Sequence, residues 1–558
     1  VAETIRMLQE IIKISPQTVE RILTETKKKR SFVPVLVSEN LSRKEVAAVA
    51  IQTPYLPGIK IDIGQTRHYP FRDLTVHLTG YVATISQSEK TGDPLLELPG
   101  FKIGKSGIEK SFDSKMRGRA AQRQVEVNAL GRIIRKLPGE EIQMGRDVEL
   151  TIDVSLQSFS TKRLAQGNSV YIPVDDPRIQ RALSQGRNLP LGTDPVNGYV
   201  NIDYRGNVMA PESGAAVVMD AFNGDVLALA STPGFDPNSF SSGMNAADWE
   251  NLLSNPRSPM TNKAVSGQYS PGSTFKMIVC LAALEAGIAH RETKVQCSGM
   301  IEFGDSRFHC WKKDGHGWLN MVQAIEQSCD VYLYELAKRV GIKRIGEMAA
   351  RFGFGETFNF GLPGENRGLI PTPAWKRKTF GQAWHAGETL ITSIGQGFIL
   401  CTPLQLAVMT CRLVNGGRSV SPRLLRNENA KILKAKSLQL NPQHLRTVLK
   451  GMNKVVNGPH GTARKVVNQN TKFQFGGKSG SVQVKRISLD ERESGKLKNK
   501  DRPWHERDHA MFVAFAPLKA PRYVASVVVE HGGEGSTMAA PIARDILAET
   551  LRLNPSKL

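Results

Sequence analysis

The chain has 558 residues, of which 40% are hydrophobic and 23% are charged. This length exceeds one ordinary domain, and the composition excludes a disordered or low-complexity protein, so we expect a folded multidomain protein. The formal net charge of +22 indicates an anionic partner.

The positive charge is spread along the chain and does not form a nucleic-acid-binding patch. Its densest stretch, residues 418–450, has no aromatic side chain on which a base could stack, so we expect no nucleic-acid partner. No apolar run reaches the roughly 18 residues of a membrane helix. Because the chain begins at Val1, we expect a fragment whose N-terminal membrane anchor was removed.

The first part of the chain combines a basic amphipathic helix at residues 18–28 with short alternating segments such as 45–53 and 124–127. Many Pro and Gly turn signals separate these segments. The pattern predicts an elongated α+β module over residues 1–145. An alternating strand at residues 147–153 is expected to open the second domain, residues 146–558.

Residues 167–212 interrupt this second domain. They are rich in Pro, Gly, Asn and Asp and show little periodicity. We therefore expect an exposed insertion, and a disordered loop is a simpler interpretation than an extra docking surface.

The remaining pattern is that of a layered α/β domain. Two apolar runs flank Asn223-Gly224, a dipeptide that tolerates positive φ, and this predicts a β-hairpin. Apolar spacing predicts helices at 277–286, 319–340 and 539–551, and strands at 511–515 and 523–530. Strands from both ends of the segment suggest one central antiparallel sheet flanked by helices.

Ser273 and Lys276 stand directly before the first of these helices. On a helix they share one face, so the lysine amine can reach the serine hydroxyl and take its proton. Ser-x-x-Lys also arises by chance, and the alternative is a capping serine beside a solvated lysine.

Two further sequence elements favour a catalytic role for Ser273 and Lys276 over the capping alternative. Ser328-Cys329-Asp330 lies within the helix expected at 319–340 and offers a second hydroxyl. Lys478-Ser479-Gly480 precedes a strand-like run that begins at Ser481. Lys478 would supply positive charge, Ser479 and Ser481 would bind a substrate carboxylate, and Gly480 would allow close approach of the backbone.

The three elements, in this order, resemble the signature of the penicillin-binding protein and β-lactamase group. Further segments resemble class B penicillin-binding proteins and their N-terminal pedestal, and Asp330, the Lys-Ser-Gly sequence, Trp311 and His316 are most similar to the elongation-specific penicillin-binding protein 2 branch. The class B landmarks are residues 220–228, 235–238, 362–365, 393–397, 402–405 and 461–463, and the pedestal landmarks are residues 67–70, 77–81 and 107–118.

The resemblance implies a peptidoglycan D,D-transpeptidase that β-lactams inhibit and that needs no cofactor for its chemistry. Ser273 would form the acyl-enzyme and Lys276 would be the general base. Ser328 and Lys478 would move protons or fix charge, and Asp330 would orient its neighbours.

The same resemblance implies stem peptides as substrates, a SEDS-family glycosyltransferase and a periplasmic shape-determining scaffold protein as partners, and the periplasmic face of the inner membrane as location. A septal homologue is the nearest alternative. A catalytically silent scaffold or a β-lactam sensor is the alternative outside the enzymes. The pedestal and the length argue against a β-lactamase.

Cys297, Cys310, His316 and Cys329 are separated by 12, 5 and 12 residues, and Cys329 is the middle residue of the second catalytic element. Three thiolates and one imidazole match a closed structural zinc site. The resemblance to the penicillin-binding protein 2 branch also implies zinc, which some relatives would hold beside the active site with two aspartates, a histidine and a cysteine at the matching positions. Cys297 and Cys310 stand where those aspartates would be. The alternative is a disulfide between Cys297 and Cys310 with a packed His316.

Overall fold

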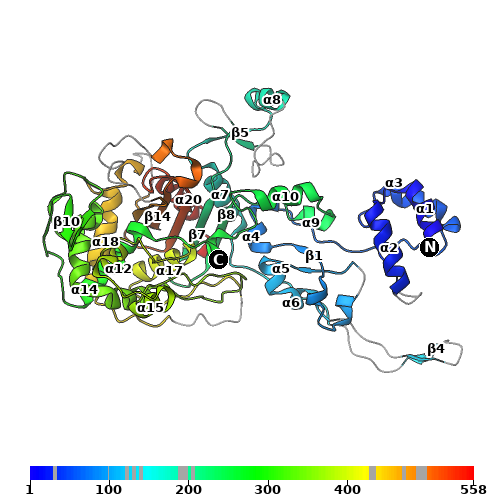
Figure 1. The fold of residues 1–558 in the computed structure, drawn as a ribbon, viewed down its shortest axis with the longest axis horizontal. Coiled ribbons are helices and arrows are strands. Elements are labelled where there is room, and N and C mark those ends of the chain that lie inside the picture. The colour runs from blue at the N-terminus through cyan, green and yellow to red at the C-terminus, as the bar shows by residue number, and fades with distance from the viewer. Residues whose placement is uncertain are drawn as a thin grey trace. The chain divides into compact units, whose positions relative to one another are not determined.

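The structure is a computed structural model. It describes residues 1–28, 34–97, 100–119, 125–127, 133–136, 143–185, 199–202, 208–426, 435–467, 473–485 and 499–557. These residues form two compact units (Figure 1), and within them no helix is long and apolar enough to cross a membrane. Unit 1 is residues 1–72, 79–148 and 236–251, and unit 2 is residues 73–78, 149–235 and 252–558.

Unit 1 is an α+β unit built from short elements. Its helices and strands are α1 (Ala2–Ile11), α2 (Pro16–Lys28), α3 (Arg43–Gln52), β1 (Val82–Thr84), β2 (Lys102–Gly104), α5 (Gly107–Ser111), α6 (Asp113–Arg117), β3 (Val125–Val127), β4 (Ile133–Lys136) and α9 (Asn238–Ser242). The strands β1 and β2 pair antiparallel, as do β3 and β4. Around α1 and α3 the buried side chains are Leu8, Ile12, Val49 and Leu56.

The strand expected at residues 147–153 does not form, and the alternating segment 45–53 is not a strand either. Residues 45–53 lie mostly in helix α3, because Ser42 and Glu45 form a capping box: Glu45 N donates to Ser42 Oγ at 3.3 Å and Ser42 N donates to Glu45 Oε2 at 2.8 Å. In residues 147–153 the backbone makes a single bridge, between Leu150 and Leu425, and no strand.

Unit 2 is organised around a five-stranded antiparallel sheet of order β13-β14-β15-β7-β8. Its strands are β7 (Gly214–Asp220), β8 (Val226–Thr232), β13 (Gly476–Val482), β14 (His509–Ala516) and β15 (Tyr523–Val529). The β7–β8 hairpin, the strands near 511–515 and 523–530, and the central antiparallel sheet are confirmed. The sheet joins the start of unit 2 to its end, since Tyr523 pairs with Asp220.

Helices cover both faces of the sheet, and every residue of β7, β8 and β15 is buried. One layer contains α7 (Val154–Gln166) and α20 (Ala539–Leu553), and α11 (Lys263–Ser266) and α17 (Pro403–Val414) pack on the other face. The other main elements of this unit are α12 (Lys276–Glu285), β9 (Val295–Cys297), β10 (Met300–Phe303), β11 (Ser306–His309), β12 (Gly317–Leu319), α13 (Met321–Glu326), α14 (Asp330–Arg351), α15 (Pro373–Phe380), α16 (Ala386–Ser393) and α18 (Pro442–Asn457).

Residues 167–212 contain regular structure where a disordered loop was expected. Strand β5 (Val170–Pro173) pairs antiparallel with β6 (Tyr199–Ile202), and helix α8 (Pro177–Ser184) follows β5. Ile172, Ile179, Val200 and Ile202 form a small buried cluster of their own. Residues 186–198 and 203–207 of this segment lie outside the described residues.

Candidate active site

Ser273 lies in a short 3-10 turn, Gly272–Phe275, directly before α12. Its side chain is half-buried, whereas Lys276 is fully buried. The turn packs against β13: a Cβ on Gly480 would lie 3.2 Å from Thr274 Cγ2 and 3.3 Å from the Pro271 carbonyl oxygen. Glycine at 480 therefore allows the close approach of the third sequence element to the nucleophile segment.

The helix expected at 319–340 is broken at Ser328, and the break forms the second sequence element. Helix α13 ends in a Schellman motif: Cys329 N donates to Ala324 O at 2.9 Å and Ser328 N donates to Ile325 O at 3.2 Å. Ser328 has φ of 54°, in the left-handed region where glycine is usual. Cys329 then caps α14 through its sulfur, which accepts from Tyr332 N.

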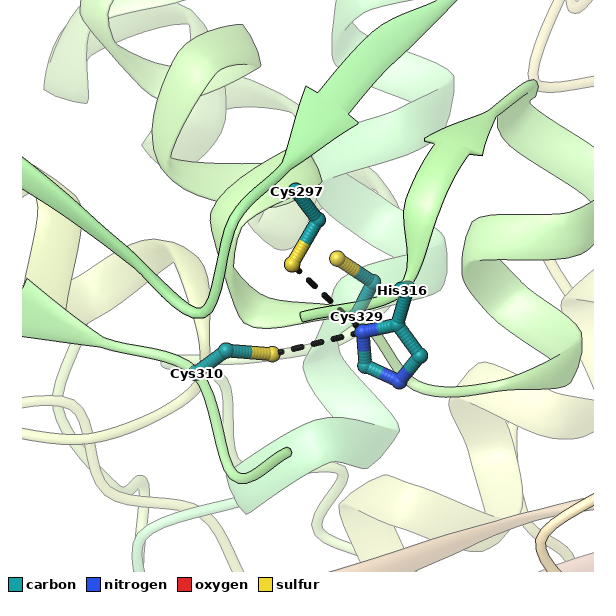
Figure 2. Close-up of side chains that lie close together, drawn as sticks. All are labelled: Cys297, Cys310, His316 and Cys329. Atoms are coloured by element: carbon teal, nitrogen blue, oxygen red, sulfur yellow. Dashed lines mark hydrogen bonds between the residues drawn. The ribbon is translucent and has the colours of Figure 1, made fainter. Parts of the chain in front are cut away.

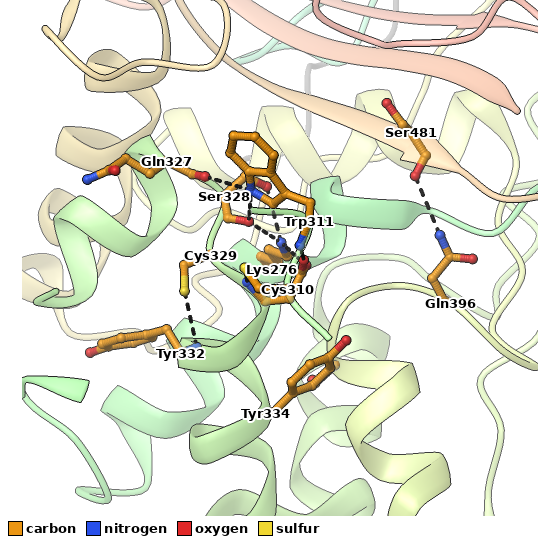
Figure 3. A network of polar contacts seen from close by, with 12 residues as sticks. Lys276, Cys310, Trp311, Gln327, Ser328, Cys329, Tyr332, Tyr334, Gln396 and Ser481 are labelled. Atoms are coloured by element: carbon orange, nitrogen blue, oxygen red, sulfur yellow. Dashed lines mark hydrogen bonds and ion pairs between the residues drawn. The ribbon is translucent and has the colours of Figure 1, made fainter. Parts of the chain in front are cut away.

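Three acceptors surround the Lys276 amine. Nζ donates to Ser328 O at 2.8 Å, to Ser328 Oγ at 3.1 Å and to Asp330 Oδ1 at 2.7 Å (Figure 3). They match the three N–H donors of a lysine ammonium. Within the described part of the chain, Lys276 makes no hydrogen bond to Ser273, although the sequence predicted that contact. Burial raises the pKa of Asp330, against the opposing effect of Lys276.

The Ser328 hydroxyl lies between two lysines. Lys478 Nζ is 3.0 Å from Ser328 Oγ and donates to Ser479 O at 2.8 Å. Lys478 is fully buried, and burial followed by the charge of Lys276 holds its pKa well below the usual range. A neutral Lys478 can accept the Ser328 proton, so Lys276, Ser328 and Lys478 form a possible proton path.

The residues of β13 that were expected to bind substrate also contact neighbouring loops. Ser479 Oγ is 2.9 Å from Thr462 Oγ1, and Ser481 Oγ accepts from Gly535 N at 3.1 Å. Gln396 Nε2 lies 3.4 Å from Ser481 O (Figure 3). Thr462 and Gln396 belonged to landmark segments in the sequence, but nothing in those patterns gave either residue a contact in the site.

Cys297, Cys310, His316 and Cys329 come together in unit 2 (Figure 2). Each offers one ligand atom, and these four atoms all lie within 4.8 Å of one another. His316 Nδ1 is 3.5 Å from Cys297 Sγ and 3.6 Å from Cys310 Sγ. The cysteines are free thiols, so the structure contains no disulfide between Cys297 and Cys310.

The sulfurs of this cluster share protons unequally. A hydrogen bond from Cys329 lowers the pKa of Cys297 to about 6, and the same donor holds the pKa of Cys310 well below its usual range. The pKa of Cys329 is raised in return by these two neighbours. Burial opposes a charge on His316, but hydrogen bonds to Cys310 and Cys297 raise its pKa. The cluster therefore favours thiolates, the form that binds metals.

Two family descriptions match the chain. The penicillin-binding protein transpeptidase domain matches residues 214–548, and the penicillin-binding protein dimerisation domain matches residues 1–150. The chain belongs to the penicillin-binding protein transpeptidase family. It is accordingly a serine-type transpeptidase, and the fold expected from the sequence, a second domain of this type with its central sheet, is confirmed.

Individual relatives agree with this assignment. The peptidoglycan D,D-transpeptidase MrdA of Acinetobacter baumannii is 33% identical over 99% of this chain and 76% of its own. The complex between penicillin-binding protein 2 and MreC from Helicobacter pylori matches with a TM-score of 0.78 and 27% identity, covering 99% of this chain and 91% of that one. A structure of a peptidoglycan synthase complex that coordinates polymerization and crosslinking matches with a TM-score of 0.68 and 27% identity over 96% of this chain and 85% of that one. The elongation branch is therefore better supported than the septal one.

Proposed function

We propose that this protein is the D,D-transpeptidase that cross-links peptidoglycan stem peptides during cell elongation, with Ser273 as nucleophile. The contact that carries the proposal is the buried arrangement of Lys276, Ser328 and Lys478, in which one hydroxyl lies 3.1 Å and 3.0 Å from two lysine amines. Such an arrangement gives a half-buried serine next to it a route for its proton. Relatives named as D,D-transpeptidases support the substrate class.

Ser273 Oγ would attack the penultimate D-Ala carbonyl and lose its proton to this network, while the C–N bond breaks and D-Ala leaves with a proton. An amine of a second stem peptide would then attack the ester and release Ser273. Lys276 can act as the base once a proton passes to Asp330, whose Oδ1 is 2.7 Å away. Ser479, Gly480 and Ser481 on β13 would hold the donor peptide.

Labelling with a fluorescent penicillin tests the nucleophile. We expect wild type to be labelled covalently, Ser273→Ala to be unlabelled, and the exposed control Ser298→Ala to be labelled as wild type is. An unlabelled wild type would reject the transpeptidase chemistry, and a labelled Ser273→Ala variant would reject the nucleophile.

Depletion in cells separates elongation from septation. Loss of an elongation enzyme gives round cells, and loss of a septal enzyme gives filaments. We expect round cells, rescued by wild type and not by Ser273→Ala. Filaments would assign the protein to the septal branch, and normal growth with wild-type wall cross-linking would favour a silent scaffold or a β-lactam sensor.

We also propose that the cysteine cluster holds a structural zinc ion. Four ligand atoms within 4.8 Å of one another, three of them sulfur, fit the number and type of ligands in closed zinc sites. Nδ1 of His316 faces two of the sulfurs, which suits it as the nitrogen ligand (Figure 2). Zinc here would fix the loops around the second catalytic element and take no part in the reaction.

Elemental analysis of protein purified without a histidine tag tests the zinc proposal. We expect one zinc per chain in wild type and in the control Cys401→Ala, whose sulfur is buried outside the cluster. Cys297→Ala should lose the metal. Wild type without stoichiometric zinc would reject the site.

The solved complexes of similar proteins support a proposal for the partners. A penicillin-binding protein 2 has been solved with MreC, and a matching structure is a synthase complex of polymerization and crosslinking. We infer that this chain works with a periplasmic shape-determining scaffold and a SEDS-family glycosyltransferase at the periplasmic face of the inner membrane. Residues 1–145 would serve as the pedestal for these contacts and residues 146–558 would form the transpeptidase domain. Co-purification with each partner, with and without residues 1–145, tests this division.

A further inference from the structure

Trp311 is an exposed tryptophan whose polar atoms are directed at the catalytic network. Trp311 is 59% exposed, yet its Nε1 donates to Gln327 O and to Ser328 O, both at 3.1 Å (Figure 3). Its backbone N–H donates to Asp330 Oδ2 at 2.9 Å. One residue therefore binds both ends of the Ser328–Asp330 segment.

The two carbonyls that Trp311 contacts belong to the end of α13, where a helix leaves backbone acceptors without partners. The Ser328 carbonyl also accepts from Lys276 at 2.8 Å. Ser328 has the left-handed conformation, which is strained for a residue with a Cβ. Two donors, the Lys276 amine and the Trp311 indole N–H, therefore hold the Ser328 carbonyl and fix the backbone that carries the Ser328 hydroxyl.

We propose that Trp311 is a positioning residue of the reaction: its indole N–H holds the Ser328 backbone so that the Ser328 hydroxyl stays between Lys276 and Lys478. This inference rests on the proposed function, and among the described residues Trp311 makes no hydrogen bond to Ser273. More than half of this residue is exposed, so its burial contributes little to the core. Its indole ring makes an edge contact with His316, at 5.4 Å between ring centroids, and its hydrogen bonds are its direct contacts with the Ser328–Asp330 segment.

Two variants separate the donor from the ring. Trp311→Phe keeps an aromatic ring and has no N–H. Trp311→Gln has no ring, but its amide nitrogen stands four bonds from Cα, as the indole nitrogen does. Trp318→Phe is the matched control, because Trp318 lies in the nearby strand β12 and is 63% exposed.

The readout is the concentration dependence of labelling by a fluorescent penicillin, which separates binding from the limiting acylation rate. For Trp311→Phe we expect the limiting rate to fall about tenfold with binding within twofold of wild type, as for loss of an interaction used in the transition state. Trp311→Gln should retain the rate within about threefold. The thermal midpoints of Trp311→Phe and Trp318→Phe should agree.

Three results would overturn the proposal: an unchanged rate in Trp311→Phe, an equal loss in the Phe and Gln variants, or a rate loss that Trp318→Phe shares. If wild type itself is not labelled, the proposed function fails. If wild type and Trp318→Phe are labelled at the same rate as Trp311→Phe, only the positioning role fails.

Discussion

The residues Ser328, Cys329 and Asp330 contribute to two buried sites whose polar atoms are satisfied differently. In the catalytic network each N–H of Lys276 has an oxygen acceptor, and the Ser328 hydroxyl connects it to Lys478. In the cysteine cluster the ligand atoms lie within 4.8 Å of one another, and a hydrogen bond from Cys329 lowers the pKa of Cys297 and of Cys310. The first site is complete from its own side chains, whereas the second brings three sulfurs and one nitrogen together as the proposed zinc ligands.

Removing Lys276 tests how far the catalytic network depends on each member. Lys276→Met leaves Asp330 and Ser328 without their buried donor, and we expect acylation by penicillin to slow about a thousandfold. Lys338→Met is the control, since Lys338 on α14 forms a partly exposed pair with Glu335 and lies over the Phe303 ring. A rate within tenfold of wild type would show that Lys478 alone can serve Ser273.

Metal removal tests the other site. If zinc binds only the folded chain, a free concentration a thousand times Kd stabilises it by about 4 kcal/mol, and a chelator should remove that stability. Cys297→Ala should start from the lower stability and should not respond to the chelator. Urea unfolding with and without chelator measures both. An equal response of wild type and Cys297→Ala would contradict a metal in this cluster.

The pH dependence of stability tests the protonation of the buried Lys478 in the catalytic network. Because the folded-state pKa of Lys478 lies below the ordinary value of about 10.4, the unfolded chain binds this proton more tightly. Its contribution to stability is fully present above about pH 10.4 and is lost as pH falls through the folded-state pKa. Within this window wild type should gain about 1.4 kcal/mol per pH unit more than Lys478→Met. Urea unfolding at several pH values measures the free energy of unfolding of both proteins. If this free energy changes with pH equally in wild type and Lys478→Met, Lys478 is charged in the folded protein.

The smallest expected effect concerns the backbone between the two sites. Ser328→Gly and Ser328→Ala both lose the hydroxyl, but only glycine adopts φ of 54° without strain. We expect the glycine variant to be more stable than the alanine variant by about 0.5–1 kcal/mol, after the entropy that glycine loses on folding. Both should be slow in acylation. Equal stabilities in urea unfolding would show that the left-handed turn relaxes when Ser328 is replaced.

Much of the fold could be predicted because its signals are local. Asn223-Gly224 between two apolar runs indicated the hairpin, and alternation with apolar content indicated β14 and β15. The break at Ser328 could not be predicted, since serine occupies a position where glycine is the usual signal. The helix at residues 45–53 carried a readable sign, the Ser42–Glu45 capping box, which the alternating apolar pattern obscured.

The sequence predicted which residues form the candidate site better than it predicted the contacts between them. Sequence order placed Lys276, Ser328 and Lys478 in one site, and spacing grouped the three cysteines with His316. Trp311 was only a landmark, because a hydrogen bond from an indole to a carbonyl sixteen residues away leaves no periodic trace. The preference of Lys276 for Asp330 over Ser273 likewise depends on where α14 begins after the break.

The segment 167–212 begins and ends at neighbouring points of unit 2. Glu212 N donates to Ala165 O at 2.9 Å, and β5 and β6 pair along their length next to this junction. The small apolar cluster of the segment is its own. A fluorescent protein or an epitope inserted between β5 and β6 would therefore join two chain ends that are already close, giving a means to follow the enzyme in living cells with its core intact.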